Sequence, residues 1–263
     1  MNLSPWLHEL TWEEIGQRAE AGGTPILVPI GSTEQHGPHL PTGTDTFLAI
    51  ALAESATRAT DALIAPPIWY GWSPHHMVLP GTITVRPEVL IDLVSDVVGS
   101  LSQHGFDRFV LLNGHRIANL PWLQLAAERA QRTLGVKVAL FDPAYMSKEV
   151  SESLGWGEIG HAEEIETSHL LHIDPHRVRM DRAVDAPPPE HALYHVDPRN
   201  PGDTLAYVPA SPNEQQPLAL RSRGVSGSPN RASPEKGKRY HEHLVARLVA
   251  VIQALEGEMP CSR

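Results

Sequence analysis

The sequence predicts an α/β fold with a mainly parallel central sheet and helices on both of its faces. Two observations predict it: four short apolar runs have the pattern of buried strands, and helical patterns separate them. The length of 263 residues suits one domain with a single substantial core. Hydrophobic residues make up 41% of the chain and charged residues 20%, which excludes a disordered or collagen-like protein. We therefore expect residues 1–263 to form one domain.

The first two strands are expected before residue 67. Residues 25–30 are an apolar run typical of a buried strand, and residues 46–58 follow as a helix because alanine and leucine recur at three- and four-residue spacing. A second apolar run, residues 62–66, predicts the second strand and leads into a loop.

The next two strands follow the same alternation. Pro87 suits the first position of a helix that ends near Gly105. Residues 108–112 predict the third strand, and a helix rich in alanine and leucine then runs to about Leu134. Residues 136–141 predict the fourth strand. Strands separated by helices are typical of a parallel sheet, because each crossover needs a connection of this length.

Prolines interrupt this pattern from about residue 184 to residue 233. Nine of them between residues 187 and 229 predict an irregular segment without long helices or strands. Such a segment serves as an active-site cover or an oligomer contact, or is disordered. Ser233, Pro234 and Glu235 then predict the capped start of a final amphipathic helix that ends near Leu255.

The net charge of the chain and its N-terminal residues indicate which partners to exclude and which compartment to expect. The formal net charge of −10 repels phosphate backbones and anionic lipids, so we expect neither nucleic acid nor a membrane as partner. No apolar run approaches the roughly 18 residues of a membrane span, and residues 1–6 lack the pattern of a secretory signal, which predicts a cytoplasmic protein. The single cysteine, Cys261, has no partner for an intrachain disulfide and is expected to be inert.

Residues with metal-binding chemistry follow the first and third strands. Ligands bind beyond the carboxyl ends of the strands in open parallel sheets. The first strand leads to Glu34, His36 and then Asp45, and the third leads to His115. Two histidines and two carboxylates without a thiolate suit Zn²⁺, Mn²⁺ or Fe²⁺, and a shared carboxylate would allow a binuclear centre. In the alternative interpretation, the carboxylates cap the next helix and the histidines make ordinary loop hydrogen bonds.

The loop after the second strand and the segment 156–169 hold further candidates. Tyr70 and His76 are candidates for substrate contact, although an ordinary surface or core role is the favoured alternative for His75 and His76. In the later segment, His161 and Glu164 are spaced to share a helical face, and so are Glu163 and Glu166. Periodicity does not choose between these pairs, and an acidic helix N-terminus is the alternative.

The order of these motifs resembles the creatininase (creatinine amidohydrolase) family. The resemblance rests on residues 31–41 with Thr44 and Asp45, on Pro80-Gly81-Thr82, on Asn113-Gly114-His115, on His161-Ala162 with Glu166-Thr167-Ser168, and on Glu235-Lys236-Gly237. It implies a three-layer α/β/α fold, a homo-oligomer that is often a hexamer, two divalent metal ions and the opening of amide bonds. It also implies five metal ligands with Asp45 bridging: Glu34, His36, Asp45, His115 and Glu166. By the same resemblance His161 transfers a proton, and Trp156 lies near the substrate pocket unless it is a core aromatic.

Departures from the family pattern argue against creatinine as the substrate. Family members commonly continue Asn-Gly-His with two glycines and an asparagine, and creatininase itself has a glutamate two positions after the histidine. Here Arg116, Ile117 and Ala118 follow His115, and Gly160 stands where creatininase has a carboxylate. Arg116 is therefore expected to meet an anionic or carbonyl-bearing substrate, with a solvent-facing arginine as the alternative.

Together with the family resemblance, these residues predict a metal-dependent hydrolase that opens a C–N bond in a small cyclic amide, with His161 protonating the departing nitrogen. Three alternatives stay open. The same site would suit ring opening of a non-amide carbonyl substrate, such as a sugar-derived ketone or lactone. The second is a metal-binding protein without turnover, and the third is a structural domain without metal.

Overall fold

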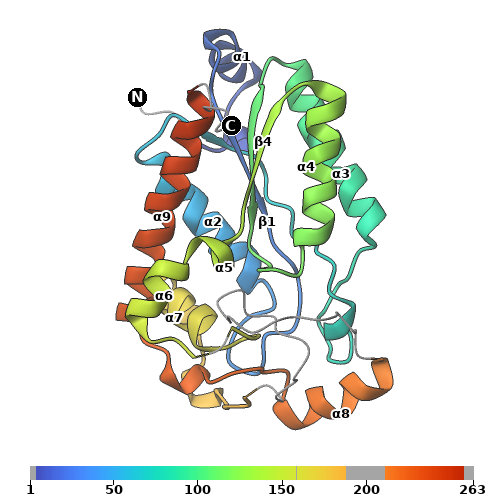
Figure 1. The fold of residues 1–263 in the computed structure, drawn as a ribbon, viewed down its shortest axis with the longest axis vertical. Coiled ribbons are helices and arrows are strands. Elements are labelled where there is room, and N and C mark those ends of the chain that lie inside the picture. The colour runs from blue at the N-terminus through green and yellow to red at the C-terminus, as the bar shows by residue number, and fades with distance from the viewer. Residues whose placement is uncertain (1–3, 158, 188–210, 258–263) are drawn as a thin grey trace, which may run out of the picture.

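The computed structural model describes residues 4–157, 159–187 and 211–257 (Figure 1). Within these residues one four-stranded sheet has the order β2-β1-β3-β4, and every pairing is parallel. The strands are β1 Ile26–Ile30, β2 Leu63–Ile64, β3 Arg108–Asn113 and β4 Lys137–Phe141. The predicted parallel sheet is confirmed, although the second strand is shorter than its apolar run.

Helices follow the strands in the expected alternation. The described α-helices are α1 Trp12–Ala21, α2 Thr44–Thr57, α3 Pro87–Gln103, α4 Leu120–Leu134, α5 Pro143–Met146, α6 Lys148–Leu154, α7 Glu164–Ile173, α8 Pro212–Ser222 and α9 Pro234–Glu256. Short 3-10 helices cover Leu7–Glu9, Pro74–His76, Pro175–Arg177, Met180–Arg182 and Pro229–Arg231. None of the helices in the described ranges has both the length and the apolar character needed to cross a bilayer.

The sheet lies between two layers of helices (Figure 1). Because side chains alternate along a strand, neighbouring residues of one strand enter different cores. Leu27 and Val110 pack with residues of α2 and α9, whereas Ile26 and Phe109 pack with residues of α3 and α4. This arrangement confirms the three-layer α/β/α architecture. It leaves the carboxyl ends of β1 and β3 side by side at one edge.

Helix α2 begins two residues before its predicted start at residue 46. The chain already turns at Pro41, whose carbonyl accepts hydrogen bonds from the backbone N and the Oγ1 of Thr44, at 3.2 and 2.7 Å. The earlier start places Asp45 in the first turn of the helix, where the positive end of the helix dipole favours a carboxylate.

The proline-rich segment contains an 11-residue helix, α8, so the expectation of no long regular element was wrong for that part. The local reason is a reciprocal cap, in which the backbone N and Oγ of Ser211 donate to Glu214 Oε2 at 2.8 and 2.7 Å. The predicted final helix is confirmed, and Ser233 Oγ accepts from Lys236 N at 3.2 Å. Residues 188–210 of the proline-rich segment, residues 1–3 and Cys261 lie outside the described residues.

Candidate metal centre

Two loops and one helix end bring four predicted ligands together at the carboxyl edge of the sheet. Glu34 and His36 lie on the loop after β1, Asp45 on the first turn of α2, and His115 on the loop after β3. All four are buried, with exposed fractions between 0 and 5%. The juxtaposition predicted from the parallel strands is therefore present in the structure.

Glycines at the ends of β1 and β3 permit this close approach. A Cβ on Gly114 would lie 2.1 Å from the backbone O of Asp45, and a Cβ on Gly31 would lie 2.5 Å from the backbone N of Thr46. No other residue would fit at either place without a shift of the backbone. Asp45 consequently sits between two imidazoles: its Oδ1 lies 3.1 Å from His36 Nε2, and its Oδ2 lies 3.1 Å from His115 Nδ1.

The ligand atoms form two trios that share Asp45. Glu34, Asp45 and His115 form the first, called the Glu34 site below, and His36, Asp45 and Glu166 form the second, called the Glu166 site. Within each trio the candidate atoms lie within 4.8 Å of one another. Glu166 comes from the first turn of α7, and its Oε2 lies 3.8 Å from His36 Nε2. A third group, Glu34 with His36 and His161, meets the same distance limit.

Buried oxygens at the Glu34 site have no hydrogen-bond partner. Both carboxylate oxygens of Glu34 and the Oδ2 of Asp45 are in this state. A buried acceptor left unsatisfied costs about 1 to 3 kcal/mol, and a bound cation would satisfy it. Carboxylate and imidazole ligands without a thiolate suit Zn²⁺ or Mn²⁺. The residues therefore fit the two divalent cations that the sequence predicts.

The electrostatics of the cluster also favour positive charge. Burial opposes protonation of His36 and His115, but the neighbouring carboxylates outweigh it and raise the pKa to about 10 for His36 and about 9 for His115. Burial raises the pKa of Glu34 to about 7. Burial also acts to raise the pKa of Asp45, but the two histidines hold it below its ordinary value. Protons on the histidines balance the carboxylates, and divalent cations would displace those protons.

Hydrogen bonds to backbone carbonyls assign the free nitrogens of His36 and His161. A carbonyl only accepts, so His36 Nδ1 carries hydrogen where it donates to Glu34 O at 3.1 Å, and Nε2, which faces Asp45, is the nitrogen that would bind a cation. His161 Nε2 donates to Gln35 O at 2.5 Å, which leaves Nδ1 facing Glu34 Oε1 at 3.5 Å. Burial, assisted by His36, holds the pKa of His161 well below its usual range. His161 is therefore a neutral imidazole that can accept a proton at Nδ1.

The loop that carries His115 is held from β4. Asp142 Oδ2 accepts from Asn113 Nδ2 at 2.7 Å and from the backbone N of Ile117 at 2.9 Å. Ile117 has a φ of +65°, which is rare for a β-branched residue and costs about 1 to 3 kcal/mol. This strain lies where the loop departs from the family pattern.

His161 is placed by a backbone bridge rather than by a helix. It pairs with Ser226 through two backbone hydrogen bonds of 2.9 and 2.8 Å, and α7 begins only at Glu164. His161 and Glu164 therefore share no helical face. Glu164 instead pairs with Lys236 Nζ at 2.5 Å and with Arg231 Nε at 3.4 Å.

His76 joins the cluster, whereas Tyr70 does not contact it in the described structure. The His76 ring stacks on that of His161, with centroids 3.9 Å apart, and its Nε2 lies 3.5 Å from Glu34 Oε1. Gln35, which the sequence analysis missed, contacts His76 Nδ1 through Nε2 at 2.9 Å. Its place between Glu34 and His36 was the available signal. Tyr70 is 46% exposed.

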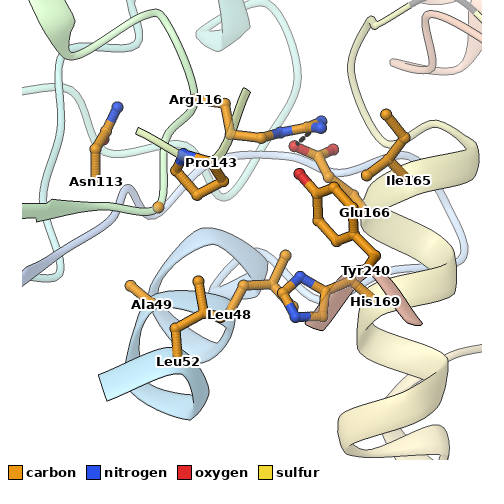
Figure 2. A pocket seen from close by; sticks show the side chains of 11 residues that line it. Leu48, Ala49, Leu52, Asn113, Arg116, Pro143, Ile165, Glu166, His169 and Tyr240 are labelled. Atoms are coloured by element: carbon orange, nitrogen blue, oxygen red, sulfur yellow. Dashed lines mark ion pairs between the residues drawn. The ribbon is translucent and has the colours of Figure 1, made fainter. Parts of the chain in front are cut away.

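Arg116 is neither solvent-facing nor unpaired. Its side chain is 6% exposed, and Nη2 forms an ion pair with Glu163 Oε1. The same Nη2 forms an ion pair at 2.7 Å with Glu166 Oε1, and Figure 2 shows this second pair. A substrate contact by Arg116 would have to use Nε or Nη1, which have no hydrogen-bond partner. Glu163 also caps α7, because its Oε2 accepts from the backbone N of Ile165 and Glu166. The three-residue spacing of Glu163 and Glu166 was the signal in the sequence that these two carboxylates lie close together.

Trp156 packs in the core. It is 9% exposed, its ring meets that of Tyr240 edge-on with centroids 6.0 Å apart, and Lys236 Nζ lies 5.0 Å from its ring centroid. These contacts match the core aromatic that the sequence left as the alternative.

Comparison with known proteins gives one family. The family model described as creatinine amidohydrolase, Creatininase, matches residues 8–252. The chain is 30% identical to the 3-dehydro-scyllo-inosose hydrolase of Thermotoga maritima, covering 98% of this chain and 86% of that protein. It is 31% identical to the creatinine amidohydrolase of Pseudomonas putida, covering 99% of each. It is 34% identical to the mycofactocin precursor peptide peptidase of Mycobacterium ulcerans, covering 86% and 84%.

Solved structures agree with the sequence relatives. A structure described as "Creatininase Mn" superposes with a TM-score of 0.81 at 29% identity, covering 98% of this chain and all of the other. A mutant creatininase of "Zn-Zn type" gives a TM-score of 0.80 at 29% identity with the same coverage.

Proposed function

This chain belongs to the creatininase family, and on that premise we propose that it is a hydrolase that uses two divalent cations, Zn²⁺ or Mn²⁺ with Fe²⁺ as a further candidate, to open a C–N bond in a small cyclic amide other than creatinine. The observation that carries this proposal is the pair of trios that share Asp45, with unsatisfied oxygens on Glu34 and Asp45. The proposed ligands are those the sequence predicted: Glu34, His36, Asp45, His115 and Glu166.

The chain's own residues would bind the cations and move the proton. When bound, the two cations supply a water nucleophile at neutral pH and polarise the carbonyl of the substrate. Asp45 belongs to both trios and would be the ligand common to the two cations. His161, fixed by Gln35 O with Nδ1 unprotonated, accepts a proton at Nδ1 and returns it to the departing nitrogen. The stacked His76 keeps the His161 ring in place.

The substrate is proposed from the departures at the β3 loop. Ile117 stands where creatininase has a glutamate, and Gly160 where it has a carboxylate, so groups expected for creatinine are missing. His76 is the proposed substrate contact with the most direct support, because it lies beside Glu34 at the cluster. Substrate contacts by Trp156, Arg116 and Tyr70 stay predictions, as do the homo-oligomer, the hexamer and the cytoplasmic location.

A second candidate function is ring opening of a non-amide carbonyl substrate. The Thermotoga maritima relative favours it, because the substrate in its name, 3-dehydro-scyllo-inosose, is not named as an amide and the match covers 98% of this chain. The same pair of cations would serve either reaction. Assay of the purified enzyme on cyclic amides, creatinine, lactones, sugar-derived ketones and a short peptide separates the candidates. Turnover of cyclic amides alone supports the first proposal, and turnover of non-amides alone refutes it.

Replacement of His161 tests its role. His161→Ala is expected to lower kcat by about 10²- to 10⁴-fold while the bound metal stays at the wild-type level, because proton transfer is lost and both trios are intact. Elemental analysis and steady-state kinetics measure the two effects. His104→Ala removes an exposed histidine and is the matched control. Loss of metal from His161→Ala would make His161 a ligand through the third group and refute the assignment.

A further inference from the structure

We propose that Arg116 makes the two cation sites unequal, because it competes with the cation of the Glu166 site for the carboxylate of Glu166. The cation at the Glu34 site would then bind tightly, and the cation at the Glu166 site would exchange more readily. This inference rests on the proposed function, since it requires both sites to bind a cation.

The two sites differ in how far their carboxylates are already satisfied. At the Glu34 site, both oxygens of Glu34 lack a hydrogen bond. At the Glu166 site, both oxygens of Glu166 are engaged: Oε1 pairs with Arg116 Nη2 at 2.7 Å, and Oε2 accepts from the backbone N of Ala162 at 2.7 Å. A cation therefore gains more by binding Glu34, whose oxygens accept no hydrogen bond, than by binding Glu166.

The sites also differ in the side chains that pair with their carboxylates. Among the described residues, the ion-pair partners of Glu34 and Asp45 are histidines, and two of these, His36 and His115, are themselves proposed ligands of the cations. Glu166 pairs with the guanidinium of Arg116 in addition to His36. A guanidinium keeps its positive charge at any pH at which a protein stays folded. A cation at the Glu166 site must therefore share a carboxylate with a permanent positive charge.

Burial makes that repulsion effective. The Arg116 side chain is 6% exposed, and it lines a small cavity with Tyr240 and His169 that has room for about one water molecule (Figure 2). Bulk water and salt cannot surround the guanidinium there, so like charges interact more strongly than at a surface. Figure 2 shows the guanidinium directed at Glu166 and away from Asn113.

Glu163 limits the effect of Arg116. The same Nη2 that pairs with Glu166 also pairs with Glu163 Oε1, so the charge of Arg116 is divided between two buried carboxylates. If Glu163 lost its charge, Glu166 would be the remaining carboxylate that pairs with Arg116. Replacement of Arg116 and replacement of Glu163 should therefore change the affinity of the Glu166 site in opposite directions.

The test is stepwise binding of Mn²⁺ to the metal-free full chain, followed by electron paramagnetic resonance of the free ion and by elemental analysis after dialysis. Wild type is expected to bind two ions with unequal affinity. Arg116→Gln is expected to strengthen the weaker step by about tenfold or more and to change the tighter step by less than about threefold. Glu163→Gln, which can still cap α7, is expected to weaken the weaker step about tenfold. Arg108→Gln removes a partly buried arginine at the opposite end of β3 and should change neither step.

Two ligand variants assign the steps to the sites. Glu166→Gln should abolish the weaker step alone, and Glu34→Gln should abolish the tighter step.

The inference is overturned if Arg116→Gln weakens binding of the second ion, if Glu163→Gln strengthens that binding, or if Glu166→Gln removes the more tightly bound ion. Equal affinities in wild type overturn the inference and leave the proposed function intact. Absence of Mn²⁺ and Zn²⁺ binding in wild type refutes the proposed function itself. If Arg116→Gln does not fold, the opposite sign expected of Glu163→Gln still decides the outcome.

Discussion

Two pairs of buried histidines in this protein have pKa values shifted in opposite directions. His36 and His115, in the candidate metal centre, are 1% and 5% exposed, and their pKa values are raised to about 10 and about 9. His169 and His241, between α7 and α9, are 2% and 8% exposed. Burial and neighbouring histidines lower the pKa of His241 to about 4 and that of His169 well below its ordinary value.

The difference lies in the partners. His36 and His115 each lie within 3.1 Å of an oxygen of Asp45. His169 Nε2 instead contacts His241 Nδ1 at 2.9 Å, and His241 Nε2 contacts Ser55 Oγ at 2.9 Å. We therefore infer that clustered histidines alone do not form a metal site and that a buried carboxylate beside them is also needed. The three predictions below test that contrast.

Asp45→Asn is expected to have the largest effect. It removes the ligand common to both trios, so metal content should fall from about two ions per chain to near zero and activity by about 10³-fold or more. Elemental analysis and the substrate assay measure these changes. His241→Gln is the matched control in the other histidine pair and should keep the full metal content. Equal metal loss in both variants would contradict the contrast between the two pairs.

Between about pH 7 and pH 9, metal binding is expected to depend on pH through the first pair. With pKa values near 10 and 9, His36 and His115 are protonated at neutral pH in the metal-free chain, so each cation must displace a proton. Apparent affinity should therefore fall about tenfold for each pH unit between about 9 and about 7, where protonation of Glu34 begins to add to the fall. Titration of metal-free protein with Zn²⁺ in weak buffer at pH 8 should release about two protons per chain. Zinc uptake without proton release would show that these histidines are already neutral.

The smallest effect expected is on acid stability, through the second pair. Unfolded histidines titrate near 6.5, whereas the fold keeps His241 neutral to about pH 4. The unfolded chain thus binds more protons in this range, and the free energy of unfolding falls as the pH drops through 6.5 toward 4. The loss is about 1.4 kcal/mol per pH unit for each such histidine. His241→Gln should make this decline shallower in urea denaturation at pH 4 to 7, and parallel curves for variant and wild type would refute the assignment.

Much of the centre follows from short-range sequence patterns. Apolar runs and helical periodicity predict the parallel sheet, and the carboxyl ends of parallel strands share one edge by geometry. That rule places Glu34 and His36 near His115, because the residues that follow β1 and β3 lie at the same edge of the sheet. Local capping patterns likewise predict the start of α9. The same kind of pattern, Ser211 with Glu214, is present for α8, but the sequence prediction for that segment rested on its prolines alone.

The partners of the later segment depended on contacts between distant parts of the chain. Spacing in residues 161–166 allowed two helical pairs, and only the bridge of His161 to Ser226 shows that α7 starts too late for one of them. The place of Arg116 between Glu163 and Glu166, and of Gln35 O against His161, likewise depends on how loops pack across the sheet edge. Periodicity predicts which face of a helix or strand is apolar. It does not predict which charged residue of one segment will contact which charged residue of another. Three-dimensional packing determines which charges meet. In this protein it determines whether each buried carboxylate pairs with an arginine, a lysine or a histidine.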